Sequence, residues 1–268
     1  MLAAARKDAL LERLRRDGRL VVKDVALELG LSEDSIRRDL RELDAAGLAV
    51  RVYGGALPAS PAVADYGARG TVARSSKSRV AAAALDLIEP GATVLLDGGT
   101  TTLALVEALP RSFAGTVITH SPTIAAALLH HEAEVIVIGG RVFKHSAVAC
   151  GSAAVEAAQR ISADIFFLGV TGVHPAAGFT TGDADEAAMK RVLAERAAET
   201  YVLASEEKLG AASRFGILPL DAVAGVVADL EPDTPLSVDL EAAGARMRYV
   251  GRSAVGRGGS HGRVSDQL

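Results

Sequence analysis

Short runs of valine, isoleucine and leucine alternate with alanine-rich stretches of helical spacing beyond about residue 74. Strands with one face exposed to solvent alternate apolar and polar residues, whereas strands buried on both faces are continuously apolar. The expected strands are Thr93 to Leu96, Thr116 to Thr119, Val135 to Ile138, Ile165 to Val170, Tyr201 to Ala204 and Val223 to Ala228. Such strands, separated by helices, predict an α/β domain with a parallel sheet covered on both faces.

The residues before this region have a different pattern. Gly18, Gly30 and Gly47 interrupt a helical apolar period, which predicts three short helices before residue 48. A stretch rich in glycine, alanine, proline and serine follows and has no apolar period, as linkers do. We therefore expect one domain at residues 1–58, a linker at 59–73, a second domain at 74–250 and a disordered tail at 251–268.

Composition limits the class of protein. A net charge of -4 and 49% hydrophobic residues are typical of a globular chain. No uncharged apolar stretch approaches the roughly 18 residues that a membrane span needs, and charges interrupt the first turns where a signal peptide would be apolar. Cys150 is the only cysteine, and the adjacent His130 and His131 lack metal-ligand spacing. We expect a cytoplasmic protein without membrane association, bound metal or cofactor.

A helix-turn-helix pattern lies within the first domain. A helix over Lys23 to Leu29 ends at Gly30, and a second helix begins behind Ser32, a capping residue. Apolar residues share one face of the second helix, while serine and arginine project from its other sides. A recognition helix offers its first turns to DNA, where arginine grips guanine edges or phosphates. The pattern predicts DNA binding, with a helical protein-interaction module as the alternative.

A short strand pair, or wing, follows the second helix. Val50 and Val52 alternate with Arg51 and Tyr53, which places the latter two on the exposed side. Residues 1–58 contain 11 basic and 10 acidic residues, so pattern rather than bulk charge supports DNA binding. The expected DNA contacts are Ser32, Ser35, Arg37, Arg38, Arg41, Arg51 and Tyr53.

The strongest local signal in the second domain follows the strand at Thr93 to Leu96. Asp97, two glycines and three threonines precede a helix. Glycine lets the backbone fold around an anion, helix-start amides point at it, and hydroxyls add donors. This order predicts a phosphate site. The loop lacks the Gly-Lys-Ser/Thr ending of the Walker loop and the Gly-x-Gly-x-x-Gly pattern of dinucleotide-binding domains, so ATP and NAD are disfavoured as ligands. The alternative is a plain strand-to-helix turn.

Loops after the other strands become candidates because open parallel sheets bind ligands beyond the carboxyl ends of their strands. Lys144 and Lys208 are possible phosphate or hydroxyl partners, with solvent exposure as the alternative for each. The expected ligand-binding residues are Asp97, Gly98, Gly99, Thr100, Thr101, Thr102, Thr119, His120, Ser121, Gly139, Gly140, Lys144, Gly172 and Lys208.

Two motifs resemble a known family. Ile36-Arg37-Arg38-Asp39-Leu40 and Tyr53-Gly54-Gly55-Ala56 look like the winged helix-turn-helix of DeoR transcriptional regulators. Residues 74–230 resemble the sensor domain of that family, which is similar in fold to ribose-5-phosphate isomerase and coenzyme A transferases. The resemblance implies a regulator, most simply a repressor, of carbohydrate-metabolism genes, with a phosphorylated sugar held at the loop of residues 98–102. His120, Gly98 and Glu206-Glu207 depart from residues frequent in the family, namely asparagine, serine and smaller polar residues.

The partners follow from this interpretation. We expect double-stranded operator DNA, a phosphorylated sugar and a homo-oligomer, dimeric or higher, because one winged domain contacts too few bases for selectivity. The main alternative is a sugar-phosphate isomerase or deaminase with an accessory DNA-binding module. Carboxylates such as Asp183 and Glu186 are available, but none can be assigned as a base, so we expect no catalytic residue. A dinucleotide-sensing repressor is disfavoured by the missing glycine pattern.

Overall fold

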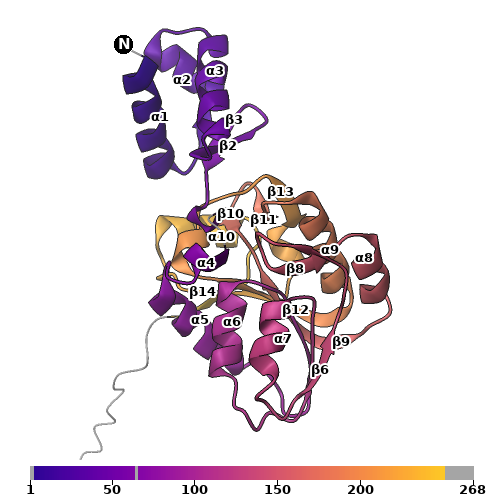
Figure 1. Ribbon diagram of the computed structural model, residues 1–268. Helices are drawn as coiled ribbons and strands as arrows, with labels where there is room; N and C mark the ends of the chain where they lie inside the picture. Colours follow the sequence, from indigo (N-terminus) through magenta and orange to yellow (C-terminus); the bar gives the residue numbers. More distant parts are fainter. Residues whose placement is uncertain (1–2, 64–65, 251–268) are drawn as a thin grey trace, which may run out of the picture.

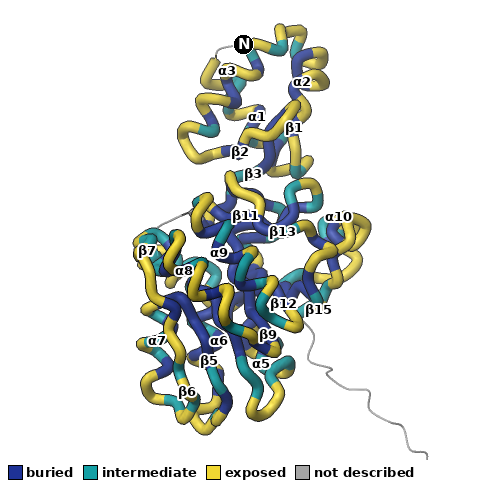
Figure 2. The backbone as a smooth tube through the Cα atoms, turned by 90° about the vertical axis from the view of Figure 1, so that its right-hand side faces the viewer, coloured by how far each residue is buried: buried dark blue, intermediate teal, exposed yellow. Residues whose placement is uncertain are grey.

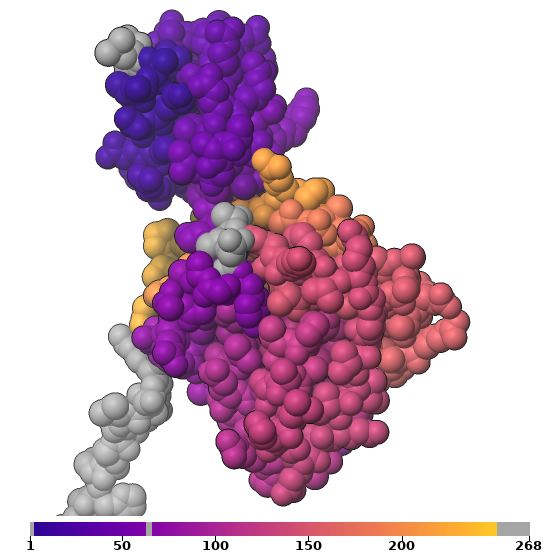
Figure 3. All heavy atoms as spheres, viewed as in Figure 1, coloured from indigo at the N-terminus to yellow at the C-terminus, as the bar shows by residue number. Residues whose placement is uncertain are grey.

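The computed structural model describes residues 3–63 and 66–250, which form an N-terminal unit and a larger α/β unit (Figure 1). The tail predicted at residues 251–268 lies outside the described residues. The N-terminal unit, indigo to purple in Figure 3, projects from the body of the larger unit. No helix in the described ranges is both long and apolar enough to span a bilayer.

The N-terminal unit contains the three predicted helices and the predicted strand pair. Its elements are α1 (Ala3–Asp17), β1 (Leu20–Val21), α2 (Val22–Leu29), α3 (Glu33–Ala45), β2 (Ala49–Val52) and β3 (Gly55–Pro58). The strands form an antiparallel sheet in the order β1-β3-β2. Leu10 and Leu14 of α1 pack with Ile36 and Leu40 of α3 in one core. Val52 departs from the predicted alternation and is 41% exposed, because it ends β2 beyond that core.

Local contacts define the ends of the second helix, α2. Gly30 follows α2 with a φ of 63°, in the left-handed region that glycine adopts without strain. Val21 precedes α2 and provides no side-chain cap, but the Val22 amide donates to the Gly54 carbonyl at 2.8 Å. The wing turn thus satisfies one of the free amides at the start of this helix.

A seven-stranded parallel sheet forms the centre of the larger unit, in the order β15-β14-β12-β9-β4-β5-β6. The strands are β4 (Thr93–Leu96), β5 (Thr116–Thr119), β6 (Glu134–Val137), β9 (Ala163–Gly169), β12 (Ala197–Ala204), β14 (Gly225–Ala228) and β15 (Met247–Tyr249). The predicted parallel sheet is confirmed, and its inner strands are largely dark blue, that is buried, in Figure 2, whereas the edge strand β6 is mostly exposed.

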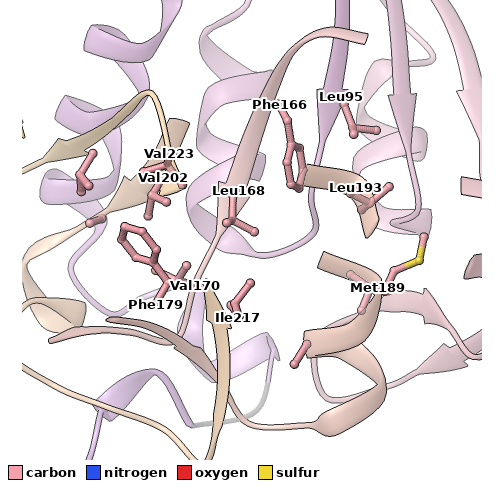
Figure 4. Packing of buried hydrophobic residues seen from close by; sticks show 14 of the residues in the cluster. Leu95, Phe166, Leu168, Val170, Phe179, Met189, Leu193, Val202, Ile217 and Val223 are labelled. Carbon is pink, nitrogen blue, oxygen red and sulfur yellow. The ribbon is translucent and has the colours of Figure 1, made fainter. Parts of the chain in front are cut away.

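Helices cover both faces of this sheet, as predicted. They are α5 (Arg74–Leu85), α6 (Thr100–Ala108), α7 (Pro122–Leu128), α8 (Ser152–Ala158), α9 (Ala184–Glu195) and α10 (Pro235–Ala242). Val94 and Leu96 share a cluster with α5, α6 and α7, whereas Leu95 lies in the cluster that includes α8, α9 and α10. Figure 4 shows this second cluster, in which Phe166 lies near Leu193. Alternate strand residues therefore face two apolar layers.

Several short elements extend this framework. They are η1 (Pro61–Val63), α4 (Tyr66–Arg69), β7 (Arg141–Phe143), β8 (Val148–Cys150), β10 (Gly172–His174), β11 (Gly178–Thr181), η2 (Glu206–Lys208), β13 (Phe215–Leu218) and η3 (Leu220–Ala222). β10, β11 and β13 form an antiparallel sheet, and β7 pairs with β8. The stretch predicted as a linker contains η1 and α4, and its boundaries stay a prediction. Ser60 in it is 1% exposed.

Candidate functional site

The exposed face of α3 carries most of the predicted DNA contacts. Ser32 caps this helix, because its Oγ accepts a hydrogen bond from the Ser35 amide at 3.3 Å. Ile36 and Leu40 anchor the opposite face in the core. Six of the seven predicted contacts are exposed and Ser35 is partly buried. The structure therefore presents these residues where a duplex could reach them.

The two neighbouring arginines of α3 differ in their surroundings. Arg37 forms ion pairs with Glu33 at 2.5 Å and Asp34 at 3.1 Å on its own helix. Arg38 has no hydrogen bond or ion pair with any residue that the structure describes. Because its guanidinium has no competing protein partner, Arg38 can bind a phosphate or a guanine edge at lower cost.

The wing adds a second exposed element. Tyr53 lies at the turn between β2 and β3 and is fully exposed, and Arg51 precedes it on β2. An aromatic ring and an arginine at the tip of a wing are suited to stacking and phosphate contacts. The wing and α3 belong to one small core, so they form one rigid candidate DNA surface.

A pocket opens where strands of the large sheet end at their carboxyl edge. Its lining residues come from the β4–α6 turn, the end of β9, helix α9, η2 and the segment after β3. They are Ala62, Arg69, Lys77, Gly98, Gly99, Thr100, Thr101, Thr102, Ser146, Gly169, Val170, Glu186, Lys190, Glu207 and Lys208. The enclosed space measures about 20 Å³, which is room for about one water molecule.

The β4–α6 turn brings backbone amides to this pocket. Gly99 adopts a φ of 110°, which favours glycine, and α6 begins directly after it. The amides in the first turn of a helix have no intrahelical partner and suit an anion. A Cβ on residue 98 would lie 2.2 Å from Cγ1 of the buried Val148, so any side chain at this position would force Val148 to move. Glycine at residue 98 avoids this clash. The predicted phosphate loop thus has the geometry of an anion cradle.

Lys208 is the buried amine beside this cradle. It is 6% exposed, and its Nζ donates to Thr101 Oγ1 at 2.8 Å and to the Leu203 carbonyl at 3.3 Å. No carboxylate of the described residues forms an ion pair with it. Burial lowers the pKa of Lys208 to about 7. A buried amine with only neutral partners is stabilised in its charged form when an anion binds.

Asp97 lies beneath the cradle and is 0% exposed. Its Oδ1 accepts from the Gly98 amide at 2.7 Å and from His120 Nε2 at 2.8 Å. Its Oδ2 accepts from the Gly169 amide at 2.8 Å and from Lys190 Nζ. Burial alone would raise the pKa of Asp97, but the charge of Lys190 and the hydrogen bond from His120 hold it well below its usual range. One carboxylate therefore positions two loops of the pocket.

The structure brings only some of the predicted ligand-binding residues together. Gly98, Gly99, Thr100, Thr101, Thr102 and Lys208 line the pocket. Asp97, Thr119, His120, Ser121, Gly139, Gly140, Lys144 and Gly172 are not among its lining residues.

The residues outside the lining have structural contacts. His120 Nδ1 lies 2.9 Å from the Ala149 carbonyl oxygen, and a Cβ on Gly172 would lie 2.4 Å from the Ala211 carbonyl oxygen. Lys144 is exposed on the turn between β7 and β8.

The sequence does not place the other charged lining residues in the site, although Glu186 and Glu207 stand out in it as an available carboxylate and a departure from the family pattern. Lys77 is 4% exposed and donates to the Arg69 and Val72 carbonyls at 2.7 and 2.6 Å. Glu186 and Lys190 lie one turn apart on α9, 3.3 Å from each other. In the sequence, Lys77, Glu186 and Lys190 are charged residues within alanine-rich helices. Charged residues in such helices are usually exposed to solvent, so the sequence alone does not reveal that these three are buried.

A short stretch, residues 169–174, lies between the pocket and the N-terminal unit. Gly169 and Val170 line the pocket, and the next residue, Thr171, accepts a hydrogen bond from Ser60 Oγ at 2.6 Å through its carbonyl. His174 Nε2 donates to the Gly18 carbonyl at 3.1 Å. Burial lowers the pKa of His174, which fits a neutral ring. The pocket wall thus contacts the N-terminal unit over a few residues.

Two family models match this chain. Residues 6–61 match the DeoR-like helix-turn-helix domain, and residues 73–230 match the DeoR C terminal sensor domain. The chain is 31% identical to the HTH-type transcriptional regulator GlpR of Haloferax volcanii over 92% of its length and 98% of that protein. It is 25% identical to the glycerol-3-phosphate regulon repressor of Escherichia coli K12, over 89% of this chain and 94% of the repressor.

A comparison with solved structures gives a weak match to an enzyme. Ribose 5-phosphate isomerase A from Methanocaldococcus jannaschii superposes with a TM-score of 0.36 at 18% identity, covering 50% of this chain and 54% of the isomerase.

Proposed function

The chain belongs to the DeoR family of transcriptional regulators, and on this premise we propose that it is a repressor of carbohydrate-metabolism genes controlled by a phosphorylated sugar. The sugar phosphate binds in the pocket at the carboxyl edge of the sheet, and α3 with the wing binds operator DNA. The protein works where its DNA is, in the cytoplasm, and as a dimer or higher oligomer that reads repeated half-sites.

The observation that carries the ligand assignment is the surroundings of Lys208. A buried amine costs free energy unless negative charge compensates it, and Lys208 hydrogen-bonds only to neutral groups among the described residues. The neighbouring charge of Glu207 offsets only part of the effect of burial, which still lowers the pKa of Lys208 to about 7. The free amides at the start of α6 lie in the same pocket. A phosphate satisfies both needs, since it combines negative charge with several acceptor oxygens.

Two carboxylates, Asp97 beneath the pocket and Glu186 in its wall, are engaged by protein donors, which favours sensing over catalysis; the third, Glu207, keeps one oxygen without a donor among the described residues. Both oxygens of Asp97 are engaged by four donors below the pocket. Glu186 accepts from Thr181 Oγ1 at 2.7 Å and lies 3.3 Å from Lys190 Nζ. A general base must reach a substrate proton, and these two carboxylates are already bound to protein donors.

Effector binding reaches the DNA-binding unit through the residues between them. A sugar phosphate needs more than about 20 Å³, so the walls of the pocket move apart when it enters. One wall holds Gly169 and Val170, and another holds Ala62. Ser60 joins these walls, because its Oγ donates to Thr171 and accepts from the Ala62 amide at 3.1 Å. Widening the pocket therefore shifts the backbone that leads to the wing.

Replacing Lys208 with methionine tests the proposed pocket. Operator duplexes selected from a random pool are titrated in a gel-shift assay with glycerol 3-phosphate, glucose 6-phosphate and fructose 1-phosphate. We expect one of these to release the parent protein. Lys208→Met should bind DNA normally but need roughly 10- to 150-fold more effector, since a hydrogen bond to a charged group is lost.

Lys144→Met is the matched control, because Lys144 is an exposed lysine outside the pocket. It should respond as the parent does. A parental response from Lys208→Met would contradict the assignment of the phosphate site. Conversion of any of these sugar phosphates to a product would favour the isomerase or deaminase alternative.

Effector affinity should depend on pH through the same lysine. A pKa of about 7 means that the empty pocket loses the Lys208 proton as the pH rises above 7, whereas bound phosphate requires it. Affinity should fall by up to about tenfold per pH unit above 7 and also below about pH 6, where the phosphate itself takes up a proton. Isothermal titration calorimetry between pH 5.5 and about 9 measures this profile. Lys208→Met should lose the alkaline decline, and an unchanged decline would assign it to another group.

A further inference from the structure

Glu207 is the acidic residue next to Lys208, and it also lines the pocket. Its side chain is 8% exposed. Oε1 accepts from Ser205 Oγ at 2.9 Å and lies 3.6 Å from Lys77 Nζ. Oε2 is buried and has no hydrogen-bond partner among the residues that the structure describes. This carboxylate therefore keeps one acceptor unsatisfied at the wall of the pocket.

A buried acceptor without a donor is unusual, because desolvation removes its water without replacement. The other acidic wall residue shows the contrast, since Glu186 has Thr181 and Lys190 as partners. A group that supplies a donor to Glu207 Oε2 stabilises the pocket. The dianionic phosphate has no donor to offer, so the donor must belong to another part of the ligand.

We propose that Glu207 is a specificity-determining residue that accepts a hydrogen bond from an effector hydroxyl close to the phosphate bound at Lys208. This inference rests on the proposed function of the same pocket. Lys208 and Glu207 are consecutive residues of η2, so they recognise adjacent groups of one ligand. Lys208 takes the phosphate, and Glu207 takes a hydroxyl on one of the next carbons.

The arrangement also selects against other anions. A carboxylate beside the phosphate repels bare inorganic phosphate, and it repels a second phosphate placed where the hydroxyl belongs. A ligand hydroxyl that donates a hydrogen bond to Glu207 offsets the repulsion between the Glu207 carboxylate and the phosphate. A ligand without this hydroxyl experiences the repulsion in full. The pocket therefore favours a polyol or sugar monophosphate over inorganic phosphate, deoxygenated phosphate esters and vicinal bisphosphates.

Three probes separate the hydroxyl from the phosphate. Glycerol 3-phosphate is a small ester with neighbouring hydroxyls, propyl phosphate lacks them, and inorganic phosphate lacks the carbon chain. Isothermal titration calorimetry on the full chain at neutral pH measures each affinity. We expect the parent to bind glycerol 3-phosphate about tenfold or more tightly than propyl phosphate, because only the former satisfies the buried acceptor.

Glu207→Ala should change the order of affinities rather than lower them all. The preference for glycerol 3-phosphate over propyl phosphate should fall to about twofold or less, and inorganic phosphate should bind several-fold more tightly because the repelling charge is gone. Glu207→Gln keeps an acceptor oxygen without the charge, so it should retain part of the preference. Glu206→Ala is the matched control, since Glu206 is an exposed neighbour outside the pocket lining, and it should behave as the parent.

A full preference retained by Glu207→Ala overturns the inference. Loss of all three affinities in a folded Glu207→Ala, judged by circular dichroism, also overturns it, because Glu207 would then only position Lys208. If none of the probes binds the parent, the proposed phosphate pocket fails and the inference fails with it. If the probes bind but the substitution leaves their order unchanged, only the inference fails.

Discussion

Arg38→Ala should weaken operator binding by at least about 30-fold while leaving the thermal unfolding midpoint at the parental value. Arg38 makes no hydrogen bond or ion pair within the described residues, so its removal costs the fold little. A specific arginine contact contributes about 1–3 kcal/mol, and two half-sites of a dimer double it. The expected loss is about 2–6 kcal/mol, or roughly 30- to 20,000-fold in affinity. Fluorescence anisotropy on a selected duplex at fixed salt measures it.

Arg15→Ala provides the control for charge. Arg15 is an exposed arginine of α1, outside the surface formed by α3 and the wing. Its removal should change the affinity by less than about threefold, as expected for a distant charge at moderate salt. Parental binding by Arg38→Ala, or an equal loss in both variants, would show that α3 does not read the duplex through this residue.

Asp97→Ala should destabilise the larger unit by about 3–5 kcal/mol, because it leaves His120 buried without its carboxylate and removes one of the two carboxylates that pair with Lys190. That is a large part of the 5–15 kcal/mol typical of a folded domain. The Gly98 and Gly169 amides also lose their acceptor. Urea unfolding followed by circular dichroism gives the free energy of unfolding.

Asp183→Ala is a matched carboxylate substitution in the same unit. Asp183 caps α9 by accepting from the Glu186 amide at 3.0 Å, and losing such a cap costs about 0.5–2 kcal/mol. If Asp97→Ala yields no folded protein, Asp97→Ala combined with Lys190→Met should recover part of the stability, because it removes the buried charge of Lys190, which has lost one of its two carboxylate partners. An Asp97→Ala protein as stable as Asp183→Ala would contradict the role of this buried cluster.

The main sheet follows from sequence because its inner strands are buried on both faces and all its predicted strands are rich in valine, isoleucine and leucine, although the edge strand β6 is mostly exposed. Thr93 to Leu96 and Thr116 to Thr119 are predicted with the bounds that the structure shows. The small antiparallel strands escape prediction for a physical reason. β10 (Gly172–His174) contains three residues with no apolar run, and it is a strand only because β11 pairs with it. Long-range pairing of this kind leaves no local periodicity.

The candidate site is only half predictable for a similar reason. The anion cradle is one continuous segment, so glycine, threonine and helix start appear together in the sequence. The buried charges come from distant segments, as the pairing of Asp97 with Lys190 across the fold shows. His120 shows the opposite case, a residue that the sequence predicts as a ligand contact but that the structure places outside the pocket lining. Its ring hydrogen-bonds to Asp97 beneath the cradle instead. Burial of a charge depends on its partner, and the partner is visible only in three dimensions.

The short stretch of residues 169–174 has a consequence for how such regulators diversify. Gly169 and Val170 touch the ligand space, while His174 touches the DNA-binding unit. Under the proposed function, the DNA-binding unit responds to displacement of this backbone wall rather than to the identity of the molecule that displaces it. New effectors can be adopted by exchanging side chains on α9 or η2, while the mechanical output stays the same. In this arrangement, the residues that would recognise the effector and the residues that would transmit its binding are different parts of one domain.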